Sequence, residues 1–244
     1  MTRRLLLLAV ALATASGCGV GASRASGDFA EIPGIGETRI DVPRPTTGTS
    51  AVCAADPLPP VSTASIAERV AGLRTIGLFA DRSDLGDAAL AADVEAGIAD
   101  VWGDAMKLDD PLLDLIVAEE DQQRVWWHDL EADVADGNDV YVETLEGWAA
   151  ISEDAFQPAG ITEHWAPGEG PVTITFSLGG EPHEITPAYL EDWIDPGILT
   201  PINELIAPEG RRFELYKSFD QTAFVMALTE AERRGLESRG WCFE

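Results

Sequence analysis

A dense set of side-chain oxygens lies in residues 128–143, which read HDLEADVADGNDVYVE. Calcium binds several oxygen ligands that a loop supplies where it turns sharply at a glycine. Gly137 provides such a turn between the acidic residues on its two sides. The stretch therefore predicts a calcium site with the candidate ligands Asp133, Asp136, Asn138 and Glu143.

The spacing of these residues does not match an EF-hand loop. If Gly137 and Glu143 took the sixth and twelfth positions, the first and third would fall on Ala132 and Val134, whose side chains carry no oxygen. A calcium site here would therefore be irregular. The alternative is an exposed acidic loop in which Asn138 or Asp139 caps the following helix.

The same carboxylates allow a hydrolytic function. Two acids near Asp129–Asp136 could serve as general acid and base on a glycosidic bond; the candidates are Asp129, Glu131 and Asp133. Tryptophan faces for sugar stacking are available nearby, although tryptophans equally fill hydrophobic cores: Trp126, Trp127, Trp148 and Trp165. Because no G-x-S-x-G, phosphate-binding glycine loop or Cys-x-x-Cys occurs, the sequence assigns no catalytic residue.

The three histidines do not form a metal-binding pattern. His128, His164 and His183 are never paired at helical spacing and have no cysteine neighbour, so zinc is disfavoured. His183 is expected to pack beside Phe176 in a hairpin, and His128 to be a partly buried structural residue.

The charge of the chain limits its partners. It carries 43 acidic and 16 basic residues, a formal charge of −27. Such a field repels phosphate backbones and anionic lipid, which excludes nucleic-acid binding and leaves a covalent anchor as the only membrane tie. The candidate partners are cations, cationic proteins, neutral ligands and other components of the cell envelope.

The first 18 residues have the layout of an export signal. A positive Thr2-Arg3-Arg4 precedes the apolar run LLLLAVAL, which is shorter than the roughly 20 residues that span a bilayer. Cleavage after Ala15 would release a secreted protein. The segment ASGC at residues 15–18 resembles instead the lipobox of bacterial lipoproteins, although that family favours Leu where Ala15 stands. The resemblance implies a lipidated Cys18 and a place on the extracytoplasmic face of the cell membrane.

The cysteine count agrees with a lipid anchor. If Cys18 carries lipid, Cys53 and Cys242 remain as an even pair in a compartment where disulfides persist. We expect them to form a bridge, which would stabilise the domain by roughly 4–5 kcal/mol in the chain-entropy model. The alternative is two buried thiols.

Helical signals dominate residues 63–156. Ser65 and Glu68 predict a capping box. Asp87 is expected to cap a second helix, Asp110-Pro111 to begin a third, and Asn138 or Asp139 to begin a fourth.

Strand signals follow from residue 157. VTITFSL alternates with period two and leads into the turn Gly179-Gly180, which predicts a hairpin in which Ile174 faces Ile185. RRFELYKSF and TAFVMAL predict a second hairpin. Thr186-Pro187 and Thr200-Pro201 are each expected to open a short helix, and Thr229 with Glu232 to cap the last one.

These elements predict a signal peptide at 1–17, a lipid-anchored flexible tether at 18–62 and one acidic α+β domain at 63–244. Its helical part, 63–156, is followed by an antiparallel sheet of two hairpins with short helices on one face. Without a motif that names a reaction, the sequence favours a non-catalytic binding or interaction module. An envelope hydrolase using the carboxylates near Asp129–Asp136 and a calcium-stabilised structural lipoprotein are the alternatives.

Overall fold

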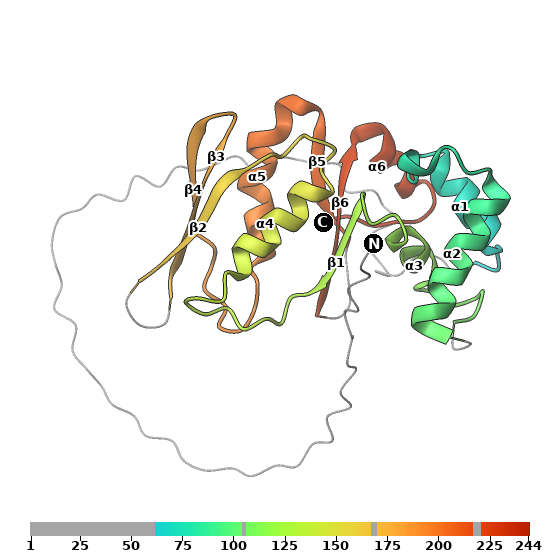
Figure 1. The fold of residues 1–244 in the computed structure, drawn as a ribbon, viewed down its shortest axis with the longest axis horizontal. Helices are drawn as coiled ribbons and strands as arrows, with labels where there is room; N and C mark the ends of the chain where they lie inside the picture. The colour runs from blue at the N-terminus through green and yellow to red at the C-terminus, as the bar shows by residue number, and fades with distance from the viewer. Residues whose placement is uncertain (1–61, 104–105, 167–169, 217–220) are drawn as a thin grey trace, which may run out of the picture. The chain divides into compact units, whose positions relative to one another are not determined.

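A computed structural model describes residues 62–103, 106–166, 170–216 and 221–244 (Figure 1). The predicted signal peptide, Cys18, Cys53 and all but the last residue of the predicted tether lie outside these residues. The described elements, in chain order, are α1 (Ile66–Arg74), η2 (Ala80–Arg82), α2 (Asp87–Trp102), α3 (Leu113–Glu119), β1 (Val125–Asp129), α4 (Val140–Ala150), β2 (Ala159–Trp165), β3 (Val172–Leu178), β4 (Glu181–Ile185), η4 (Pro196–Ile198), α5 (Leu199–Ile206), η5 (Ala207–Glu209), β5 (Arg211–Leu215), β6 (Thr222–Thr229) and α6 (Glu230–Glu237).

The strands form two antiparallel sheets, and the predicted α+β class is confirmed. One sheet has the order β1-β6-β5 and the other β2-β3-β4. Both predicted hairpins are present, and Ile174 faces Ile185 as expected. The hairpins nevertheless lie in different sheets, and each pairs with a third strand from earlier in the chain.

Strand β1 interrupts the segment that we predicted to be helical. It pairs with β6, so that Val125 lies opposite Met226 and Trp127 opposite Phe224. A five-residue strand offers little periodicity of its own. Its conformation depends on backbone partners far downstream, which the local sequence does not reveal.

The sheet β1-β6-β5 separates two hydrophobic cores. Alternate residues of β6 point to opposite sides: Phe224, Met226 and Leu228 join the core around α1, α2 and α3. Ala223, Val225 and Ala227 join the core around α4, α5 and β3. Figure 1 shows α1–α3 on one side of β6 and α4 and α5 on the other. The sheet is therefore covered on both faces, whereas we predicted helices on one.

Two predicted capping boxes are confirmed, at Ser65 with Glu68 and at Thr229 with Glu232. Asp87 is the first residue of α2 rather than its cap, and its carboxylate pairs with Arg74 at 2.6 Å. The helix predicted at Thr186-Pro187 is absent from the described chain, and Thr200-Pro201 lies inside the first turn of α5.

The N-terminus of α4 is capped from another element. Asp139 occupies the N-cap position, so the helix begins where it was predicted, but at φ 53° its side chain makes no capping hydrogen bond. Glu163 of β2 accepts from the backbone amides of Tyr141 at 2.6 Å and Val142 at 3.2 Å. Its other oxygen accepts from Trp165 Nε1 at 2.9 Å. A carboxylate at this end also complements the helix dipole.

Glu119, at the end of α3, is expected to make stability depend on pH. Burial, reinforced by Glu120, raises its pKa from 4.5 to about 7. The folded state therefore holds this proton to higher pH than the unfolded chain, and stability falls as pH rises from 4.5 to about 7. Glu119→Gln should add about 3 kcal/mol near pH 8 and little near pH 4. Urea unfolding at both pH values tests this. The control Glu95→Gln, on an exposed site of α2, should leave the free energy of unfolding unchanged at both pH values.

Candidate functional site

The four predicted calcium ligands are exposed and do not converge. Asp133, Asp136, Asn138 and Glu143 all lie at the surface. The Asn138 amide donates to the Asp133 carbonyl at 2.9 Å, which closes the loop without an ion. Among the described residues, no group of three or more His, Cys, Asp or Glu side chains could hold a metal. Calcium stays a prediction for which this part of the chain offers no assembled ligand set.

Of the carboxylates considered for hydrolysis, Asp129 serves the local fold. Asp129 accepts from the Glu131 amide at 2.9 Å and from Gln221 Nε2 at 2.7 Å. Glu131 and Asp133 are exposed. Trp126 and Trp148 lie in the second core, 7% and 1% exposed, in edge-to-face contact. These two tryptophans fill a core rather than offer a sugar-stacking face.

The histidines take structural positions. His128 stacks on Trp126 with ring centroids 4.5 Å apart, and burial lowers its pKa although Glu143 opposes the shift. His183 packs beside Phe176, as predicted. His164 lies within hydrogen-bonding distance of Thr162 and Thr175 on the exposed side of the second sheet.

Cys242 is 2% exposed and takes part in a disulfide. The sequence predicts Cys53 as its partner, and Cys53 lies outside the described residues. The pairing therefore stays a prediction.

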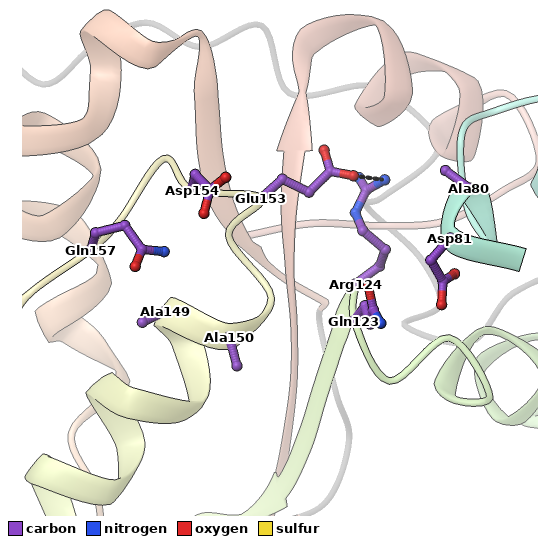
Figure 2. A pocket seen from close by; sticks show the side chains of 9 residues that line it. All are labelled: Ala80, Asp81, Gln123, Arg124, Ala149, Ala150, Glu153, Asp154 and Gln157. Atoms are coloured by element: carbon purple, nitrogen blue, oxygen red, sulfur yellow. Dashed lines mark ion pairs between the residues drawn. The ribbon is translucent and has the colours of Figure 1, made fainter.

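A polar hollow of about 320 Å³ lies between the segment after α1, the start of β1 and the end of α4. Figure 2 shows Arg124 meeting Glu153 across it, with Asp154 and Gln157 to one side and Asp81 to the other. Glu153 and Asp154 both have positive φ, 49° and 68°. This backbone turn brings the Glu153 carboxylate back to Arg124, at 3.2 Å.

Arg124 and Glu153 belong to a closed ring of four charges. Arg124 also contacts Glu232 at 2.9 Å, and Arg211 contacts both Glu232, at 2.9 Å, and Glu153. The ring joins the turn before β1, the segment after α4, β5 and α6. Since both oxygens of Glu153 already face guanidinium groups, the arrangement serves as a structural clamp between the elements around the first sheet.

A second hollow, of about 490 Å³, is mainly apolar. Tyr189, Leu190 and Trp193 stand around it, 38%, 44% and 37% exposed. We call these three side chains the platform. They are three of the five large hydrophobic residues that are exposed in the described chain, gathered within five positions. An apolar cluster of this kind at a protein surface is typical of an interaction site.

Backbone hydrogen bonds hold in place residues 188–197, which we call the platform loop. The Ile194 amide donates to the Leu130 carbonyl at 2.9 Å, and the Ala132 amide to the Asp192 carbonyl at 2.7 Å. Asp195 closes the loop from its other end, because its two oxygens accept from the amides of Ala188 at 2.7 Å and Gly197 at 2.8 Å. The platform is therefore fixed in the absence of a partner.

Gly170 leaves room for the ring of Tyr189 because it has no side chain. A Cβ at this position would lie 2.7 Å from the Tyr189 ring, and the φ of +53° also favours glycine. The sequence did not indicate the platform, because a helix expected to open at Thr186-Pro187 would place Tyr189, Leu190 and Trp193 at i, i+1, i+4 spacing on one helix face. The backbone bonds to residues 130–132 replace that helix.

The platform lies in a part of the chain that contains no cationic side chain. Residues 125–210 include 18 Asp and Glu, all three histidines, and no Lys or Arg. Next to the platform, Glu131, Glu191 and Asp192 are exposed. Glu131 is bridged to Trp193 through the backbone, and Glu191 lines the hollow. The apolar centre is therefore bordered by negative charge.

No family model, curated protein or solved structure matches this chain. Within the described residues, no helix combines the length and the apolar character needed to cross a membrane.

Asp195→Ala is expected to loosen the platform loop. The change removes the acceptor of two backbone amides and should cost about 1–2 kcal/mol. Hydrogen exchange at Ala188 and Gly197 should accelerate. Asp192→Asn, an exposed change in the same loop, should leave both amides as protected as in the unmodified protein. Equal exchange rates in the two variants would contradict the role of Asp195 in holding the loop.

Proposed function

We propose that this chain is an extracytoplasmic lipoprotein, anchored through Cys18, whose folded domain is a non-catalytic module that binds a protein partner through the platform. The observation that carries the proposal is the fixed, exposed group of Tyr189, Leu190 and Trp193. Trp and Tyr are enriched among the residues that dominate binding energy at protein interfaces. A loop already held in one conformation loses little entropy when a partner docks.

The alternative functions have less support. A glycosidase needs two carboxyl groups facing each other across a cleft, whereas Asp129 bonds to Gln221 and to its own chain. A calcium-stabilised lipoprotein needs converging ligands, whereas no group of three or more His, Cys, Asp or Glu side chains among the described residues could hold a metal. Binding through an apolar surface requires no such constellation.

The anchor is tested by mass spectrometry of the native N-terminus. We expect a chain that begins at Cys18 and carries diacylglycerol. An intact Met1, or a chain that begins at Ser16 without acyl mass, would overturn the membrane anchor but not the binding surface.

The binding surface is tested by a photoreactive amino acid placed at position 190 in cells. We expect one adduct of defined mass, lost when Trp193 is also changed to Asp. The same probe at position 95, an exposed site on α2, should not form that adduct. If neither position forms an adduct, or both form the same one, the platform is not the contact surface.

A further inference from the structure

We infer that the partner of the platform is a cationic protein segment with an apolar side chain at its centre, an inference that rests on the proposed function. The apolar side chain would enter the hollow between Tyr189, Leu190 and Trp193. Lys or Arg side chains beside it would face Glu131, Glu191 and Asp192.

The apolar centre sets the first requirement on the partner. The hollow of about 490 Å³ is open at the surface and presents apolar side chains to a partner. Leu130, Ile194 and Pro196 complete its lining with further apolar surface. A purely polar partner would leave this surface unmatched.

The charges around the centre set the second requirement. Three exposed carboxylates surround the platform, and no residue from 125 to 210 supplies a compensating Lys or Arg. An acidic partner would place like charges together at the rim, which costs several kcal/mol in an interface. A basic partner instead gains electrostatic steering toward this face.

The same charges disfavour two other occupants. A second copy of this chain would bring its own acidic rim against this one. An anionic lipid surface would meet the platform with repulsion rather than attraction. Charge complementarity therefore selects a basic protein segment.

The experiment uses the full-length protein in a non-ionic detergent, labelled with 5-fluorotryptophan, and three synthetic peptides of equal length. The first carries a central Trp-Leu pair between Lys and Arg residues. The second replaces Trp-Leu with Gly-Ser, and the third replaces the basic residues with Asp and Glu. Fluorine NMR reads the Trp193 resonance, assigned through Trp193→Phe, and fluorescence anisotropy of labelled peptides gives the dissociation constants.

We expect the first peptide to shift the Trp193 resonance and to bind at least about tenfold more tightly than either of the others. Raising the salt concentration should weaken the binding without abolishing it, because salt screens the rim but not the apolar centre. Glu191→Lys with Asp192→Lys should weaken it about tenfold. Asp84→Lys with Glu95→Lys makes the same change of net charge at exposed sites in the other part of the domain and should change it less than twofold.

Several results would overturn the inference. These are equal or tighter binding of the acidic peptide, equal binding of the Gly-Ser peptide, and equal weakening by the two double variants. Self-association of the protein, or binding to vesicles containing anionic lipid through Trp193, would do the same. If the adduct at position 190 forms but the basic peptide does not bind, the inference fails while the proposed function stands. If the adduct does not form and the basic peptide does not bind, both the inference and the proposed function fail.

Discussion

Glu232→Gln is expected to destabilise the domain by about 3 kcal/mol at neutral pH, because it removes one charge from a largely buried ring. Glu232 is 12% exposed and contacts Arg124 and Arg211, each at 2.9 Å. Arg124, 4% exposed, would lose this contact and keep its ion pair with Glu153. The same carboxylate accepts from the Thr229 amide at 2.7 Å at the start of α6, so the change also weakens a helix cap. Urea unfolding measures the loss.

The pH dependence separates this effect from general damage to the fold. Burial alone would raise the pKa of Glu232, but the Thr229 amide and Arg124 outweigh it and hold the pKa below 4.5. Its stabilisation is therefore complete above about pH 4.5 and is lost as pH falls through the lowered pKa. The difference in the free energy of unfolding between Glu232→Gln and the unmodified protein should therefore become smaller at acidic pH.

Glu230→Gln is the matched control. Glu230 lies in the same first turn of α6 and pairs with Arg234, but the two side chains are 62% and 72% exposed. An exposed pair of this kind contributes at most about 0.5 kcal/mol. Two results would refute the structural role of the ring. One is an equal loss of unfolding free energy in the two variants, and the other is a loss for Glu232→Gln that does not change with pH.

Asn203→Leu is expected to cost about 2–4 kcal/mol, since it leaves two buried backbone groups without a partner. The Asn203 side chain, 9% exposed, imitates a neighbouring strand at the outer edge of β5. Its amide nitrogen donates to the Phe213 carbonyl at 2.8 Å, and its oxygen accepts from the Phe213 amide at 2.7 Å. Helix α5 thereby satisfies an edge of the first sheet that would otherwise invite pairing with another chain.

A second substitution distinguishes this pairing from core packing. Asn203→Asp keeps the acceptor for the Phe213 amide but puts an oxygen against the Phe213 carbonyl, so it should also destabilise. Hydrogen exchange at Phe213 should accelerate strongly in Asn203→Leu and less in Asn203→Asp. Asn138→Ala, which removes an exposed side-chain bond, should cost less than about 1 kcal/mol. Unchanged protection of Phe213 in Asn203→Leu would contradict the assignment.

Signals that act within a few residues could be predicted correctly. The capping boxes at Ser65 and Thr229 join residues three apart, and the Gly179-Gly180 turn fixes the register of the β3–β4 hairpin. The period of two in VTITFSL also placed Phe176 beside His183. Each of these features depends on one stretch of chain, so its sequence contains the whole interaction.

Features that join distant segments could not be predicted. Glu163 caps α4 from β2, Asn203 pairs with Phe213 across from α5, and β1 exists as a strand because β6 lies beside it. The platform follows the same rule. Its residues have helical spacing, but backbone bonds to Leu130 and Ala132 hold them in a turn in which Leu190 pairs with Trp193.

The acidic character of the chain, the α+β class, the locally capped helices and the two hairpins can all be read from the order of the residues. The sequence also predicts the export signal and the lipidated Cys18. The long-range contacts of the fold bring the hairpins into different sheets, close a ring of four charges and leave three apolar side chains exposed together. Local hydrogen bonds and periodicity are encoded in neighbouring residues. Burial and charge pairing instead depend on which distant segments the fold brings into contact.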